Sequence, residues 1–115
     1  MNRVEKSKEK YKQLFGNGVP AAYATDSDFQ DILSRFIFGE VFYQGNLDDK
    51  HRELITLVVL ATNQTLPQLK AHVLAALNVG LTPVEIKEAV YHVQCSWKAH
   101  IWKTVGDVNE IIPEN

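Results

Sequence analysis

Apolar side chains recur every three or four residues along most of this 115-residue chain. That spacing collects them on one face of an α-helix. Strands would instead show sustained alternation of apolar and polar residues between turns, and the sequence has no such stretch. It therefore predicts an all-α fold, a compact bundle of five to six helices.

The first two predicted helices both end at glycines. A lysine-rich amphipathic segment stops at Gly16, and a loop with a Gly-Asn-Gly-Val-Pro run follows it. Residues 1–24 are thus expected to form an N-terminal helix and loop. The second helix has its expected cap at Thr25 or Asp26 and is predicted to continue until Gly45 and Asn46.

The third and fourth predicted helices make up the centre of the chain. Asp48 is the expected N-cap of the third, whose interior from residue 54 to 61 is apolar on nearly every side. Such a helix belongs at the centre of the domain or of an oligomer. Thr65 and Gln68 match a capping box at the start of the fourth helix, which is predicted to end at Gly80.

The fifth predicted helix has the clearest start signal in the sequence. It combines a cap, a first-turn proline and a capping-box acid in Thr82, Pro83 and Glu85. The helix therefore begins at Pro83. Either this helix runs on or it breaks near Ser96 into a sixth helix that reaches about Ile111, and we favour the break.

Length and charge narrow the class of protein. A chain of this length suits one domain, residues 1–115. A formal charge of -2 disfavours nucleic-acid binding, and the longest apolar run is too short to cross a membrane. No apolar secretory leader follows Met1, so we expect a cytoplasmic protein. The lone cysteine, Cys95, cannot form a disulfide within the chain.

Glu53 and His72 are the first candidates for chemistry. If the third and fourth helices pair as an antiparallel hairpin, these two side chains approach each other. A carboxylate that accepts a hydrogen bond from an imidazole fixes the tautomer of the imidazole, and such a pair can transfer a proton. The alternative is structural: a core histidine with its hydrogen bonds satisfied, and a glutamate that complements the helix dipole.

Metal binding is the second possibility. His92, Cys95 and His100 would share one face of a continuous helix, and zinc accepts both residue types. No second His or Cys pair at ligand spacing occurs in the sequence. We therefore expect no metal site, and nothing in the sequence points to another cofactor.

Three motifs in the central part of the chain carry a family resemblance. They are Arg-Glu-Leu at 52–54, a histidine at 72 followed by Ala-Ala-Leu-Asn-Val-Gly at 75–80, and Thr-Pro-Val-Glu-Ile-Lys-Glu at 82–88. Over about residues 38–91 the chain resembles the carboxymuconolactone decarboxylase family. The resemblance implies an alkylhydroperoxidase D-like helical fold that assembles into a homo-oligomer, a trimer or a hexamer.

The resemblance also implies which chemistry is absent. In the peroxidase branch the site comprises a glutamate, a Cys-x-x-Cys motif and a histidine. Glu53 and His72 match the proton-relay positions, but the cysteine positions fall on Thr65 and Gln68. A hydroxyl and an amide cannot replace the nucleophilic thiolate, so peroxide reduction by that route is not expected.

The decarboxylase branch fits what remains. There the resemblance implies removal of carbon dioxide from a small carboxylated lactone or a related cyclic acid, without a cofactor. His72 is then the catalytic acid or base, Glu53 its orienting partner and Arg52 a substrate-binding clamp for a carboxylate. The small-molecule carboxylate is the expected partner.

One segment departs from the family pattern. Where the decarboxylases carry a tyrosine and a Gly-Phe-Pro turn, this chain has Gln-Cys-Ser-Trp-Lys-Ala-His at 94–100, which points to another substrate. Two alternatives stay open. One is a thiol reductase that uses Cys95 with an external thiol, and the other is a helical oligomer without catalytic activity.

Overall fold

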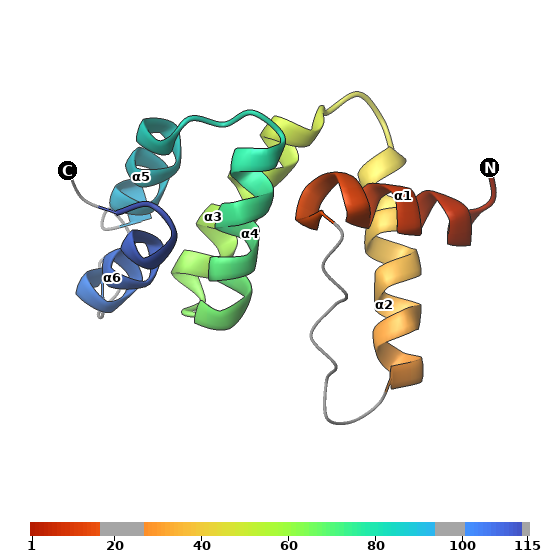
Figure 1. Ribbon diagram of the computed structural model, residues 1–115, viewed down its shortest axis with the longest axis horizontal. Helices are drawn as coiled ribbons and strands as arrows, with labels where there is room; N and C mark the ends of the chain where they lie inside the picture. The colour runs from red at the N-terminus through yellow and green to blue at the C-terminus, as the bar shows by residue number, and fades with distance from the viewer. Residues whose placement is uncertain (17–26, 94–100, 114–115) are drawn as a thin grey trace. The chain divides into compact units, whose positions relative to one another are not determined.

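The computed structural model describes residues 1–16, 27–93 and 101–113. These residues form six α-helices and one short 3-10 turn and contain no strand, which confirms the all-α prediction (Figure 1). None of the described helices is long and apolar enough to cross a membrane. The elements are α1 (Arg3–Phe15), α2 (Ser27–Gly39), η1 (Val41–Tyr43), α3 (Asp49–Thr62), α4 (Leu66–Asn78), α5 (Pro83–His92) and α6 (Ile101–Ile111).

The chain divides into two compact units, Met1–Leu47 and Asp48–Asn115, and each is described by itself. The first contains α1, α2 and η1. Its core is aromatic, because the rings of Tyr11, Phe15, Phe38 and Phe42 lie with centroids 4.6 to 5.8 Å apart. The organisation of residues 1–115 as a single domain stays a prediction.

The two helices of the first unit end at glycines, but only one end lies where the sequence predicts it. Gly16 follows α1 with a positive φ of 75°, as expected for a helix stop. The prediction that the second helix continues to Gly45 is wrong, because α2 ends at Gly39. A Cβ at Gly39 would lie 2.5 Å from the backbone oxygen of Arg3, so α1 passes too close for any other residue.

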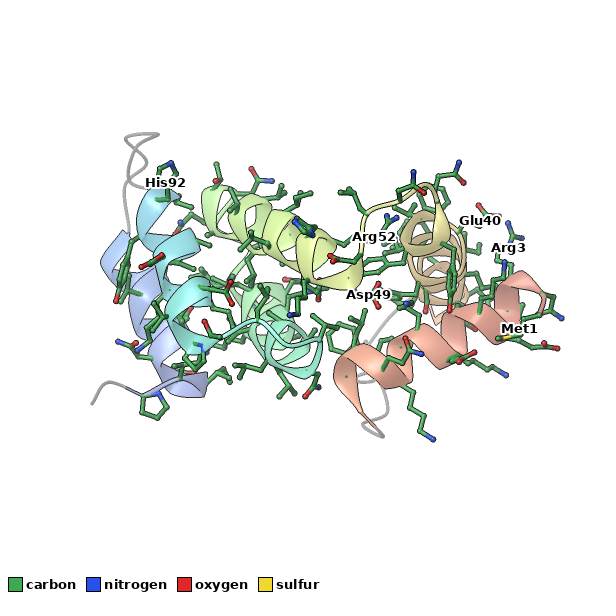
Figure 2. All side chains as sticks on the ribbon, turned by 90° about the horizontal axis from the view of Figure 1, so that it is seen from above. Met1, Arg3, Glu40, Asp49, Arg52 and His92 are labelled. Carbon is green, nitrogen blue, oxygen red and sulfur yellow. The ribbon has the colours of Figure 1, made fainter. Side chains whose placement is uncertain are left out.

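An exposed ion pair also spans this crossing. Nη1 of Arg3 lies 2.7 Å from Oε1 of Glu40, the residue at which the chain leaves α2 (Figure 2). Both side chains are about half exposed, so the pair itself adds little stability.

The second unit contains the helical hairpin of α3 and α4, which lie side by side, followed by α5 and α6 (Figure 1). Leu57 and Ala61 from α3 pack with residues from the other three helices in one apolar cluster. The rest of the cluster comprises Leu69, Val73, Ala76, Leu81, Ile86, Val90, Val93, Val108 and Ile112.

Two of the three predicted caps in this unit are confirmed. Asp48 accepts a hydrogen bond from the backbone N–H of His51, which lowers the pKa of its carboxyl. Thr82 and Glu85 form a reciprocal capping box, with bonds of 2.9 and 3.1 Å, and the bond from Thr82 lowers the pKa of Glu85. α5 therefore begins at Pro83 as predicted.

The predicted capping box at the start of α4 is wrong. Thr65 is the N-cap residue, but its side chain makes no capping hydrogen bond. Its ψ is 72°, whereas Asp48 and Thr82 have extended ψ values of 171° and 156°. With this ψ the Thr65 hydroxyl does not bond the N–H of Gln68, which a capping box requires, and Pro67 offers no other N–H in the first turn.

α3 and α4 end in the same way. Gln64 follows α3 with a φ of 58°, and its N–H and that of Thr65 bond back to Ala61 and Leu60. Gly80 has a φ of 100° at the matching position after α4, so the predicted stop there is confirmed. Both ends are Schellman motifs, in which a left-handed residue closes the helix.

α3 is less enclosed within its unit than the sequence suggests. Leu57 and Ala61 are fully buried, but Ile55, Val58 and Val59 on another side of the helix are exposed, Ile55 by 53%. Burial of α3 at the centre of the domain is therefore not observed within the unit. Burial in an oligomer stays a prediction.

Candidate functional site

The two candidate residues of the helical hairpin are in contact. Glu53 lies in the first half of α3 and His72 in the middle of α4. Nδ1 of His72 is 2.7 Å from Oε1 of Glu53 and 3.1 Å from Oε2. The hairpin forms as the sequence indicates, and it brings together the two residues expected to meet.

The pair lies at the edge of the buried interior. Glu53 is 0% exposed, whereas the His72 side chain is 16% exposed. The imidazole faces the carboxylate through Nδ1, so a carboxylate ion at this position, which only accepts hydrogen bonds, would accept a hydrogen bond from the Nδ1 proton. Buried Glu53 thus orients a ring that is itself partly accessible.

α4 is held against α6 close to this pair. Nζ of Lys70, two residues before His72, lies 2.7 Å from Oε2 of Glu110 and 3.6 Å from Oδ1 of Asp107. The hydrogen bond that Lys70 donates to the carboxylate of Glu110 raises the pKa of Lys70. These ion pairs join the helix that carries the imidazole to the last described helix.

The other predicted site residues stand as follows. Arg52 is half-buried on α3, about 100° around the helix from Glu53, and its role in binding substrate stays a prediction. Thr65 and Gln68, at the family's cysteine positions, lie at the start of α4, and the side chain of Gln68 is exposed. The α3–α4 hairpin thus contains the Glu53–His72 pair and no thiol.

The metal and thiol candidates fall mostly outside the described residues. Cys95 and His100 belong to the segment 94–100 and are not described. His92 is exposed at the end of α5 (Figure 2). Among the described residues, no three His, Cys, Asp or Glu side chains lie close enough to hold a metal ion.

Sequence reasoning missed two polar residues that connect the hairpin to α6. Nε2 of Gln64, in the turn between α3 and α4, donates a hydrogen bond of 3.0 Å to the hydroxyl of Thr104. Thr104 is fully buried. Neither residue matches a motif, and a glutamine with positive φ has no sequence signature, so no local signal would have found them.

The described helices and this pair define a class: an all-helical protein with a buried carboxylate bonded to an imidazole on one helical hairpin. The chain belongs to the carboxymuconolactone decarboxylase family, whose model matches residues 27–96, more than half of the chain. The matched range extends beyond both ends of residues 38–91 and includes α2 to α5. The resemblance seen in the sequence is therefore confirmed.

Two curated relatives are similar over the same part of the chain. A 4-carboxymuconolactone decarboxylase from Acinetobacter baylyi is 37% identical over 67 residues, which are 58% of this chain and 50% of the relative. The nitrosuccinic acid decarboxylase npaB from Metarhizium robertsii is 35% identical over 63 residues, 55% of this chain and 44% of the relative. The chain spans about half the length of the curated relatives it matches.

Proposed function

We propose that this protein is a decarboxylase that removes carbon dioxide from a small carboxylated substrate by acid–base catalysis. The observation that carries the proposal is the 2.7 Å hydrogen bond between Nδ1 of His72 and the buried carboxylate of Glu53. Family membership and two relatives named as decarboxylases support it. In this proposal His72 is the acid or base and Glu53 its orienting partner.

The chemistry needs an electron acceptor and a proton. Decarboxylation breaks one C–C bond, and carbon dioxide departs while the electron pair stays on the substrate. Delocalisation into the substrate stabilises that pair, and a proton then completes the carbon. His72 protonated at Nε2 donates this proton, while the carboxylate of Glu53 stabilises the imidazolium and holds the ring. Solvent returns the proton to His72, so no electrons are exchanged with a cofactor.

The substrate class follows from what the two relatives have in common. Their names denote different electron acceptors, a lactone in one and a nitro group in the other, and a carboxyl group in both. For this chain we propose a small carboxylic acid whose carboxyl group leaves its electron pair on such an acceptor. The Glu53–His72 pair can act on any substrate of this kind, because it donates its proton only after the bond to carbon dioxide weakens.

Arg52 is the proposed anion clamp. A guanidinium binds a carboxylate through two parallel hydrogen bonds, which both neutralises and orients it. Arg52 is half-buried on the same helix as Glu53. On this reasoning Arg52→Met raises KM more than it lowers kcat, because it removes binding common to the ground state and the transition state.

The protein is also proposed to work as a homo-oligomer, a trimer or a hexamer. The exposed apolar side chains of Ile55, Val58 and Val59 on α3 support this, because a second copy would remove them from water. Light scattering after size-exclusion chromatography measures the assembly directly. A monomer at micromolar concentration would contradict this part of the proposal.

The test of function measures carbon dioxide release from two substrates supplied separately, 4-carboxymuconolactone and nitrosuccinic acid. Turnover of at least one is expected, and His72→Ala should abolish it without changing the helical content or the oligomeric state. His92→Ala is the matched control, since it removes an exposed histidine from the same unit.

A second measurement follows the proton. In deuterated water the product should carry one deuterium at a carbon that shared the electron pair left by carbon dioxide, because the acid exchanges with solvent. A fully active His72→Ala protein would contradict the assignment of His72. Absence of turnover with both substrates would contradict the substrate class.

A further inference from the structure

Gln64 has a backbone conformation that its own side chain makes unfavourable. Its φ of 58° is the only positive value at a non-glycine position in the described parts of the chain. Gly80 occupies the equivalent position after α4, where glycine adopts the left-handed region without steric cost. A glutamine in this position therefore needs a compensating interaction of its side chain.

The side chain of Gln64 supplies that interaction. Its Nε2 donates to the carbonyl of Ala61 at 2.7 Å and to the hydroxyl of Thr104 at 3.0 Å, and this hydroxyl lies 3.3 Å from Oε1 of the same amide. One amide thus joins the last turn of α3 to α6. Because Thr104 is fully buried, the link lies inside the unit and is protected from water.

The turn that contains Gln64 determines how α3 and α4 align. Only residues 63–65 connect the two helices, so their conformation sets the register of the hairpin. At 1.5 Å of rise per residue, Glu53 lies roughly 14 Å from one end of this turn and His72 roughly 9 Å from the other. A slip of one residue would rotate a side chain by about 100° and break the bond between them.

We propose that Gln64 is a positioning residue for the Glu53–His72 pair. Its amide, anchored on Thr104, holds the α3–α4 turn in the conformation that aligns the imidazole with the carboxylate. The functional meaning of this inference rests on the proposed acid–base role of the pair. The structural claim, that Gln64 aligns His72 with Glu53, does not depend on that role and can be tested separately.

The first test removes the Thr104 hydroxyl that binds the Gln64 amide and leaves the sequence of the turn unchanged. Thr104→Val deletes the hydroxyl at nearly constant volume, and Thr104→Ser is the matched control that retains it. The measurement is the NMR signal of the Nδ1-bound proton of His72 in protein labelled with ¹⁵N at histidine, since this proton reports the hydrogen bond to Glu53. We expect an upfield shift or loss of the signal in Thr104→Val, and the wild-type signal in Thr104→Ser.

A second variant covers the case in which Thr104→Val does not fold. Gln64→Gly tolerates the left-handed backbone and removes the whole side chain, including its amide. Because the link to Thr104 is then lost, we expect the same change in the His72 signal. Lys70→Met is the comparison, because it removes ion pairs between α4 and α6 without touching the turn. It should leave the signal unchanged.

Turnover provides the functional readout. With a substrate that the wild type decarboxylates, Gln64→Gly is expected to lower kcat by up to about 100-fold at constant KM, since small misplacements of catalytic groups cost this much. An unchanged His72 signal in Gln64→Gly would overturn the inference, as would an equal change in Lys70→Met. If the wild type has no activity, the proposed function fails while the NMR comparison still decides the role of Gln64.

Discussion

Replacing Glu53 and His72 by leucine, singly and together, should give destabilisations that are far from additive. Each single change leaves one polar group without its partner in a place from which water is largely excluded. The double change replaces both with apolar groups of similar size. The three variants therefore separate the energy of the pair from the cost of leaving it half complete.

The two single variants should differ because the two residues differ in burial. His72→Leu leaves the carboxylate of Glu53, which is 0% exposed, without a partner, and we expect a loss of about 4 kcal/mol. Glu53→Leu leaves an imidazole that is 16% exposed and can remain neutral, so the expected loss is about 2 kcal/mol. The double variant should lie within about 1 kcal/mol of the wild type.

Urea unfolding followed by far-UV circular dichroism measures these free energies. All four proteins should be compared at one protein concentration, because assembly couples stability to concentration. A double variant that loses the sum of the single losses would refute the reasoning, and so would a Glu53→Leu protein less stable than His72→Leu. A double variant that is stable but inactive would indicate that the pair serves function at no gain in stability.

Three further predictions concern the helix ends. Thr82→Ala should lower the free energy of unfolding by about 1 kcal/mol in urea titrations, because it removes half of the capping box with Glu85. Since folding lowers the pKa of Asp48 below 3.8, its carboxylate stabilises the fold above that value and stops doing so as the pH falls through the folded pKa. Asp48→Asn should therefore be less stable than the wild type at about pH 7, because the amide carries no charge, and this difference should shrink at about pH 3, as measured by urea unfolding at both pH values. Gly80→Ala should lower the thermal midpoint and cost about 1 to 2 kcal/mol, because φ is 100° and a Cβ would lie 2.8 Å from Cε of Lys50.

Much of the second unit could be predicted from the sequence because its helix ends are encoded locally. A cap residue and the N–H it binds are three residues apart, so Asp48 and Thr82 are recognisable without any tertiary information. The Glu53–His72 contact was also predictable, since it needs only two neighbouring helices joined by a short turn. Local rules failed at Thr65, whose ψ of 72° differs from the extended values of the two caps that form.

What could not be predicted depends on contacts between distant parts of the chain. Position 39 needs glycine because α1 passes close to it, and the sequence around Gly39 does not contain this information. Gln64 takes a conformation that favours glycine because Thr104, 40 residues later, binds its amide. In both cases a partner far along the chain overrides the local preference.

The two hydrogen-bonded links of the hairpin differ in the length of chain they enclose, and this has a consequence for the order of folding. Glu53 and His72 are 19 residues apart, whereas Gln64 and Thr104 are 40 apart. Closing the longer loop costs roughly 0.6 kcal/mol more chain entropy, and it also requires α6 to have reached the hairpin. The shorter contact can thus form within the hairpin alone, and arrival of the last helix then restricts the hairpin to one alignment. Alignment of the Glu53–His72 pair would therefore be completed only when Thr104, on the last described helix, reaches the hairpin.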